Sequence, residues 1–183
     1  RIFYKEARSI SSKGYNVTLV AQHERNENLS GIKIIALKPP KDRLSRMLIS
    51  TWTIYKIAKK QNADIYHFHD PELIPVGLLL KTRKKKVIYD VHEDLPAQIM
   101  TKEWIPQIYR RPLSFLLKYF ESFAARRFDA IITTSKDISD RFIVSNSNTA
   151  TVHNYPMLQE ITHIAETDSK SYDANCIREI KKI

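Results

Sequence analysis

The sequence predicts an α/β fold in which a parallel sheet carries helices on both faces. Two observations lead to this prediction. Short apolar segments rich in Val, Ile and Thr alternate along the chain with longer segments whose apolar residues recur at helical spacing. Strands that alternate with helices in this way pair in parallel, because each helix returns the chain to the same end of the sheet.

The first part of the chain is expected to contain a helix and two strands. Residues 1–12 have a helical pattern that ends before Gly14, where a C-cap glycine belongs. Residues 15–21 and 31–37 are rich in β-formers and are expected to be strands joined by a polar loop. Because the helix begins at residue 1 with no capping residue before it, we expect the chain to be a fragment that has lost residues upstream.

The rest of the chain continues the alternation. An amphipathic helix is expected over residues 43–60, and the next helix begins at Pro71, because proline is tolerated in a first helical turn. Further elements are expected at 64–68 (strand), 87–91 (strand), 96–110 (irregular, with short helical pieces), 111–128 (helix), 130–134 (strand), 135–144 (helix capped by Thr134 or Ser135) and 149–153 (strand). Residues 1–156 are expected to form one domain, and residues 157–183 a linker or the start of another.

Composition and charge narrow the possible functions. The chain has 30 basic and 20 acidic residues and a formal net charge of +10, which attracts polyanions such as nucleic acid, anionic lipid or a phosphorylated substrate. No RNA-binding aromatic signature, zinc-finger spacing or basic zipper is present, so we expect no nucleic-acid partner. The single cysteine, Cys176, and the lack of a membrane-length apolar run favour a cytoplasmic location.

Two clusters of ionisable residues follow neighbouring predicted strands. Their members are His67, His69, Asp70 and Glu72 in the first cluster, and Asp90, His92, Glu93 and Asp94 in the second. Because the carboxyl ends of parallel strands meet at one edge of a sheet, we expect both clusters to face a common cleft. Imidazoles and carboxylates there could bind sugar hydroxyls or a phosphate, or transfer protons. For any one of them, capping a helix or facing water explains its position equally well.

The same strand ends offer other possible ligand sites. Thr134 and Ser135, at a strand-to-helix turn, offer hydroxyl and backbone N–H groups to an anion. His67 and His69 alternate on one strand face, and His92 with Asp70 could complete a metal site. The chain has no helical HExxH pair, and its one cysteine lies in the least organised segment, so we expect no metal. It has three glycines and no GxGxxG or phosphate-loop motif, so we expect no dinucleotide or ATP cofactor.

Five motifs in the chain form a recognisable combination. They are Arg1–Ser9 (RIFYKEARS), His69–Leu73 (HDPEL) with Pro75–Gly77, Val87–Asp94 (VIYDVHED), Thr133–Ser135 and Val152–Pro156 (VHNYP). Together they resemble bacterial glycosyltransferases of family 4. The resemblance runs from Arg1 to about Pro156.

The resemblance implies the GT-B architecture, in which two Rossmann-like domains face each other across a cleft. The N-terminal domain of such enzymes mainly binds the acceptor. Their C-terminal domain holds the nucleotide-sugar donor with paired glutamates, and transfer retains the anomeric configuration, usually without a bound metal. This chain would correspond to the N-terminal domain. The family's first strand and glycine-rich loop would precede Arg1, and its donor domain would follow Asn154.

The resemblance also implies roles for particular residues. His92 matches the histidine that contacts the reacting sugar or acceptor, and His69, Asp70 and Glu72 match residues that line the cleft. The parent protein would then be a glycosyltransferase acting in cell-surface polysaccharide or lipid-linked oligosaccharide synthesis, and this chain alone would be inactive. Two alternatives stay open: a non-catalytic binding or membrane module, and another two-Rossmann sugar enzyme such as a nucleotide-sugar epimerase.

An enzyme with a lipid-linked acceptor would have to act at a bilayer surface. We expect peripheral attachment to the inner face of the plasma membrane through the helix at 43–60. Its polar side carries Arg43, Arg46, Lys56 and Lys60, with Ile49 and Ile57 among them. An equally good explanation is that this helix covers the sheet while its lysines face water.

Overall fold

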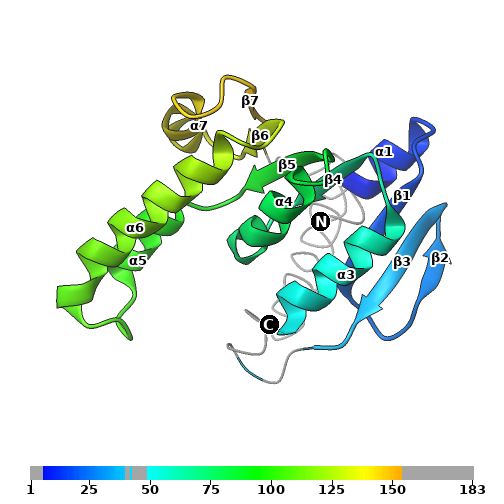
Figure 1. Ribbon diagram of the computed structural model, residues 1–183, viewed down its shortest axis with the longest axis horizontal. Coiled ribbons are helices and arrows are strands. Elements are labelled where there is room, and N and C mark those ends of the chain that lie inside the picture. The colour runs from blue at the N-terminus through cyan, green and yellow to red at the C-terminus, as the bar shows by residue number, and fades with distance from the viewer. Residues whose placement is uncertain (1–5, 40–41, 43–48, 154–183) are drawn as a thin grey trace, which may run out of the picture.

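The computed structural model describes residues 6–39, 42 and 49–153, and the statements below refer to them (Figure 1). Its strands form two sheets. The smaller has the order β1-β3-β2 and contains β1 (Val17–Gln22), β2 (Glu27–Leu29) and β3 (Ile32–Leu37). The larger has the order β4-β5-β6-β7 and contains β4 (Ile65–Phe68), β5 (Lys86–Val91), β6 (Ala130–Thr133) and β7 (Thr149–Thr151).

The helices follow the predicted alternation. They are α1 (Arg8–Ser12), α3 (Thr51–Gln61), the 3₁₀ turn η3 (Pro71–Leu73), α4 (Ile74–Lys81), α5 (Leu95–Thr101), α6 (Gln107–Ala125) and α7 (Lys136–Ile143). All neighbours in the larger sheet pair in parallel, and helices flank this sheet (Figure 1). The predicted α/β fold with a Rossmann-like parallel sheet is confirmed.

Two details of these elements differ from the sequence predictions. Strand β2 was predicted as loop, because a three-residue polar segment carries no β-forming pattern. It pairs antiparallel with β3, and the Asn26 side chain accepts a 2.8 Å hydrogen bond from the Ala36 N–H beside it. The residues expected to be irregular at 96–110 contain most of α5 and the start of α6. Of the helix expected over 43–60, residues 43–48 lie outside the described part of the chain.

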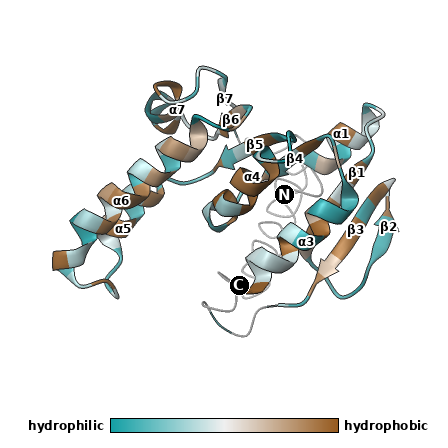
Figure 2. Cartoon of the chain, viewed as in Figure 1, coloured by the Kyte–Doolittle hydropathy of each residue, from teal (hydrophilic) through white to brown (hydrophobic). Residues whose placement is uncertain are grey.

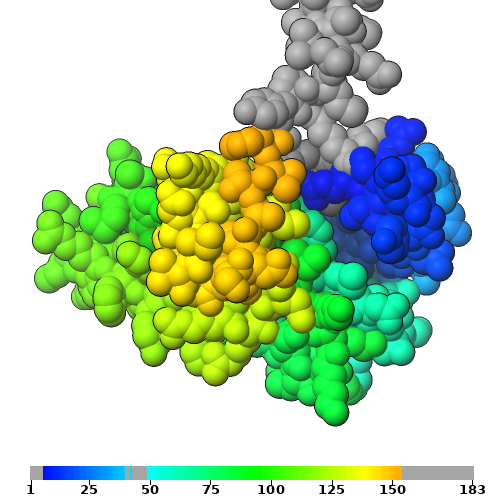
Figure 3. All heavy atoms as spheres, turned by 90° about the horizontal axis from the view of Figure 1, so that it is seen from above, coloured from blue at the N-terminus to red at the C-terminus, as the bar shows by residue number. Residues whose placement is uncertain are grey.

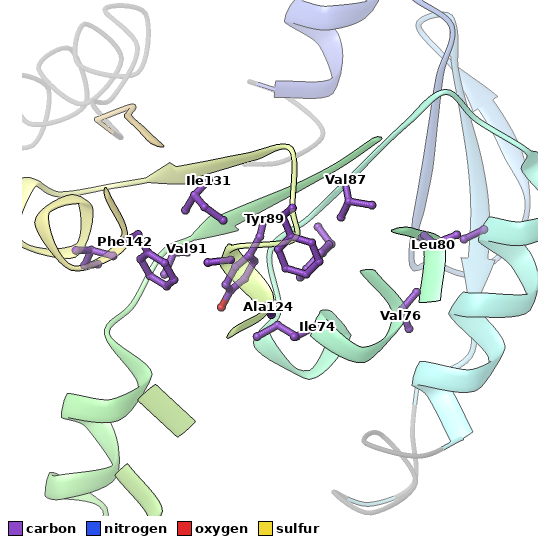
Figure 4. Close-up of a cluster of buried hydrophobic side chains, with 14 residues drawn as sticks. Ile74, Val76, Leu80, Val87, Tyr89, Val91, Ala124, Ile131 and Phe142 are labelled. Carbon is purple, nitrogen blue, oxygen red and sulfur yellow. The ribbon is translucent and has the colours of Figure 1, made fainter. Parts of the chain in front are cut away.

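The larger core fills one face of the larger sheet. Val87, Tyr89 and Val91 alternate along β5 and point into it, together with side chains from α4, α6 and α7 (Figure 4). The Phe68 ring stacks on Tyr89 at 4.9 Å between centroids. A Cβ added to Gly77 would lie 2.8 Å from Phe68 Cε1, so glycine at this position lets α4 approach the sheet closely.

The opposite face of the same strands is polar near their carboxyl ends. Side chains alternate between the two faces of a strand, so the residues between the core positions, His67 on β4, His69 directly after it and Asp90 on β5, lie on the other face. This alternation brings the ionisable side chains together while Phe68 and Tyr89 build the core.

None of the helices in the described ranges is long and apolar enough to cross a bilayer.

Candidate functional site

Asp90 is the centre of a group of imidazoles at the carboxyl edge of the larger sheet. Its Oδ2 atom lies 3.1 Å from His69 Nδ1, 3.3 Å from His92 Nε2 and 3.4 Å from His67 Nε2. The Asp90 side chain is only 5% exposed, whereas the side chain of His92 is 22% exposed. A buried carboxylate therefore faces three histidines that are open to solvent to different degrees.

His69 connects this group to the N-terminal segment. Its Nδ1 atom lies 2.9 Å from His92 Nε2, and its Nε2 atom lies 3.4 Å from Oε2 of Glu6, directly before α1. The rings of His67 and His69 are 4.7 Å apart between centroids, and those of His69 and His92 are 5.1 Å apart. Glu6, His67, His69, Asp90 and His92 thus form one continuous group, which we call the histidine cluster.

Strand pairing and a hydrogen bond to the backbone position His69, Asp90 and His92. β4 and β5 pair in parallel with Phe68 opposite Tyr89, so His69 and Asp90 are level with each other at the end of this ladder. His92 follows β5 directly, and the Thr134 hydroxyl donates a 3.1 Å hydrogen bond to its carbonyl oxygen. The turn after β6 therefore supports the position of His92.

Electrostatics favour the ionised form of Asp90. Burial alone would raise the pKa of this carboxyl. The close contacts of the His67 and His69 imidazoles with Asp90, and the positive charge that His92 and His69 can carry, outweigh burial and hold the pKa of Asp90 well below its usual range. The site therefore contains a fixed negative charge that can compensate for a proton on a neighbouring imidazole.

The other predicted site residues occupy different positions. Asp70 is exposed and precedes η3, where its side chain makes no capping hydrogen bond, and Glu72 is half-buried in η3. Asp94 caps α5 by accepting from the Ala97 N–H at 3.2 Å, and Glu93 is exposed beside it and accepts from Gln98.

Ser135 caps α7 by accepting from the Ile138 N–H at 3.4 Å, which confirms one of the two predicted caps. Of the predicted site residues, the structure therefore joins His69 and His92 directly and Thr134 through a backbone contact. Asp94 and Ser135 have capping functions that explain their positions.

His67 and Asp90 belong to the two strand-end clusters that were predicted to face the cleft, but the family resemblance implied no role for either of them, and Glu6 was not among the predicted site residues. The period-two alternation of His67 with His69, and of Asp90 with His92, was a usable signal for two of them. Glu6 had no such signal, because its contact with His69 spans more than 60 residues of sequence.

Four members of the histidine cluster could also hold a cation. The donor atoms of Glu6, His67, His69 and Asp90 all lie within 4.8 Å of one another. Two imidazoles and two carboxylates are a ligand set suited to Zn²⁺ or a similar transition metal rather than to Mg²⁺. The set differs from the one considered from the sequence, because Glu6 and Asp90 take the places of Asp70 and His92.

Comparison with known proteins agrees with the motif combination. The family model described as Glycosyltransferase Family 4 matches residues 1–154, which include both sheets and the whole histidine cluster. No curated protein matches the chain.

Proposed function

The chain belongs to glycosyltransferase family 4, and on that premise we propose that it is the acceptor-side half of an enzyme that transfers a sugar from a nucleotide-sugar to a glycan or lipid-linked acceptor. The observation that carries this proposal is the position of His92. Its side chain is accessible at the edge of the larger sheet and is backed by Asp90 and His69. Ligands of open α/β sheets bind outside this edge.

The proposed reaction is a group transfer in which the two domains that form the cleft have separate tasks. The bond between the anomeric carbon and the diphosphate oxygen breaks, a bond from the acceptor oxygen to the anomeric carbon forms, and the acceptor proton is released. Such a reaction requires alignment of donor and acceptor and stabilisation of the departing diphosphate. We assign contact with the reacting sugar or acceptor to His92, and lining of the cleft to His69, Asp70 and Glu72.

The other proposed substrate contacts lie around the same edge. Glu93, Asp94, Thr134 and Ser135 are assigned to substrate binding, and Asp94 and Ser135 combine this role with helix capping. The resemblance supports transfer with retention of configuration, and no cofactor besides the donor substrate. A nucleotide-sugar epimerase has no support from the family match.

Binding of the donor is assigned to a second Rossmann-like domain with paired glutamates, as the family resemblance implies. Residues 1–183 are then expected to release no nucleoside diphosphate from UDP-, GDP- or dTDP-sugars. A longer protein that joins them to that domain should release one of these products in the presence of an acceptor. Turnover by residues 1–183 alone would contradict the assignment to the acceptor side. No turnover by the longer protein with any donor would favour a non-catalytic binding module.

A further inference from the structure

Four side chains of types that bind metal ions converge at the carboxyl edge of the larger sheet. They are Glu6 from the segment before α1, His67 from β4, His69 directly after β4, and Asp90 from β5. One donor atom of each lies within 4.8 Å of the others. Hydrophilic residues, drawn in teal, stand at the ends of β4 and β5 (Figure 2). The N-terminal residues, drawn in blue, lie beside the part of the chain that carries these strands (Figure 3). We call the four residues the ligand group.

The distances within the ligand group suit a metal ion better than hydrogen bonding. His67 Nε2 lies 3.4 Å from Asp90 Oδ2, and His69 Nε2 lies 3.4 Å from Glu6 Oε2. Hydrogen bonds from nitrogen to oxygen are usually about 2.7–3.2 Å long. Ligand atoms at about 2.1 Å from a tetrahedral Zn²⁺ ion lie about 3.4 Å from one another. These two pairs of atoms therefore already have the separation that the ion requires.

Two buried atoms of the ligand group lack a hydrogen-bond partner among the described residues. They are Asp90 Oδ1 and His67 Nε2. Asp90 is 4% exposed, so water does not readily replace the missing partner. A buried polar atom without a partner destabilises the folded chain. A bound cation supplies the partner, because a carboxylate oxygen and a neutral imidazole nitrogen both bind metals through a lone pair.

The charge of the ligand group fits one divalent cation. Its two carboxylates together carry a charge of −2 when ionised, and its two imidazoles are neutral when they bind a metal. A divalent ion therefore neutralises a site in which the Asp90 side chain is only 5% exposed. Imidazole ligands favour Zn²⁺ and similar transition metals, whereas Mg²⁺ and Ca²⁺ prefer a shell of oxygen atoms.

We propose that the ligand group binds Zn²⁺ or a similar transition-metal ion, and that the bound ion slows sugar transfer. Four protein ligands fill a tetrahedral coordination shell and leave no position for water or substrate. Such a closed site supplies no Lewis acid to the reaction, so transfer itself needs no cation. The inhibition rests on the proposed function of His92, whereas the binding does not.

Metal binding competes with the contacts that support His92. His69 Nδ1 lies 2.9 Å from His92 Nε2, and Asp90 Oδ2 lies 3.3 Å from the same atom. Lone pairs of His69 and Asp90 that bind the ion are not available for contacts with His92 or with a substrate. The metal-free protein is therefore the active form, and Zn²⁺ is an inhibitor that acts on the acceptor side.

Zinc titration of the purified chain tests the binding without any sugar transfer. Cys176 is replaced with serine in every protein, because a thiolate is itself a zinc ligand. After treatment with EDTA and dialysis, competition with a chromogenic chelator should show one Zn²⁺ bound per chain, with a dissociation constant of about 1 µM or lower. A large excess of Mg²⁺ should not displace it.

Matched variants locate the zinc site. His67→Ala and Glu6→Gln should each weaken zinc binding at least about tenfold. His23→Ala changes a histidine that also contacts a carboxylate, at 2.7 Å from Glu27, and should bind Zn²⁺ within about twofold of the wild type. Thermal unfolding gives an independent readout. Zn²⁺ should raise the unfolding temperature of the wild type and of His23→Ala, but not that of His67→Ala.

The longer protein with both domains tests the inhibition. Zn²⁺ at about ten times its dissociation constant should lower sugar transfer at least about fivefold, because about nine-tenths of the sites are then filled. EDTA should restore the transfer. The ratio of turnover with and without Zn²⁺ is taken within each variant, so an effect of His67→Ala on transfer itself cancels. For His67→Ala this ratio should stay within about twofold of one.

Different results would overturn the two halves of the proposal. Zinc binding is refuted if no saturable binding is found, or if His67→Ala and Glu6→Gln leave the affinity unchanged. Inhibition is refuted if Zn²⁺ leaves the turnover of the wild type unchanged, or lowers that of His67→Ala equally. If the longer protein transfers no sugar from any donor, the proposed function fails. Titration of residues 1–183 then still decides whether the ligand group binds Zn²⁺.

Discussion

The guanidinium of Arg141 donates a 2.8 Å hydrogen bond to Oε2 of Glu121, and this pair joins α7 to α6 beside the larger core. The Glu121 side chain is 1% exposed and that of Arg141 is 12% exposed. The Tyr89 hydroxyl donates to the other carboxylate oxygen at 3.2 Å. Burial raises the pKa of Glu121, and the contacts with Arg141 and Tyr89 offset this rise only in part.

Removal of one charge of the Glu121–Arg141 pair should therefore lower the free energy of unfolding more than removal of both charges. Arg141→Met leaves a buried carboxylate without its cation and should lower the free energy of unfolding by about 3–5 kcal/mol. Glu121→Gln/Arg141→Met should recover a large part of that loss, as measured by urea unfolding. Arg127→Met, which changes an exposed arginine, serves as the control. Equal costs for the single and the double variant would contradict the coupling.

The raised pKa of Glu121 also sets a pH dependence. A group whose pKa is higher in the folded than in the unfolded state contributes stability at low pH and loses that contribution as pH rises through the folded pKa. The deficit of Arg141→Met relative to wild type should therefore grow from pH 5 to pH 8, because loss of the arginine raises the folded-state pKa of Glu121 further, and folding must then keep this carboxyl protonated or bury its charge without a partner. A deficit that is constant over this range would show that removal of Arg141 does not raise the pKa of Glu121.

Asp129 should produce the opposite pH dependence. Its Oδ2 atom accepts hydrogen bonds of 2.7 Å from Lys81 Nζ and from the Val87 N–H, at the other end of the larger sheet. Burial would raise the pKa of Asp129, but these two contacts outweigh burial and lower it. The contribution of Asp129 to the free energy of unfolding is thus present above its unfolded-state pKa of about 3.9. It is lost as pH falls through the folded-state pKa.

Asp129→Asn should lower the free energy of unfolding by about 1–2 kcal/mol at pH 7, and this difference should shrink below about pH 4. Chemical unfolding at a series of pH values measures both effects. Glu24→Gln, at an exposed carboxylate, is the control and should change little. If the cost of Asp129→Asn is the same at pH 3 and pH 7, the ion pair does not account for it.

Chelation tests the proposal that transfer needs no bound metal. Excess EDTA should leave turnover of the longer two-domain protein within about twofold of its untreated value, because the proposed chemistry assigns no step to a cation. The four possible metal ligands Glu6, His67, His69 and Asp90 define the opposite outcome. Loss of turnover that Zn²⁺ restores in the wild type but not in His67→Ala would make this cluster a catalytic metal centre.

The sequence predicted most of the larger sheet because its strands are short, apolar and rich in β-branched residues. Ile65–Phe68, Lys86–Val91 and Ala130–Thr133 differ from the predicted strands by only one residue at an end. The single sheet implied by the alternation was not found, since the described strands pair in two sheets and β1 has no hydrogen-bonded contact with β4. Which distant strands pair with each other is a tertiary property that the pattern within one strand does not encode.

Part of the candidate site was also predictable from the order of the strands. The topology rule places strand ends at a common edge, and His69 and His92 do meet there. It cannot show which other side chains approach, so Asp90 was not selected as the centre. The apolar residues Phe115, Tyr119 and Phe123 on α6, which helical spacing alone would assign to the core, are exposed. Helical spacing identifies an apolar face, but it does not reveal whether the protein itself covers that face.

The most direct test of the account concerns His92. In the longer protein with both halves of the cleft, His92→Ala should lower kcat/KM by at least about 100-fold, which corresponds to about 2.7 kcal/mol of transition-state stabilisation. The unfolding temperature should fall by no more than a few degrees, because the side chain is accessible at the sheet edge. His23→Ala provides the matched control, since His23 also lies beside a carboxylate, at 2.7 Å from Glu27, but directly follows β1 of the smaller sheet and does not belong to the histidine cluster. An unchanged kcat/KM for His92→Ala would contradict the assignment of the sugar-transfer site to this edge.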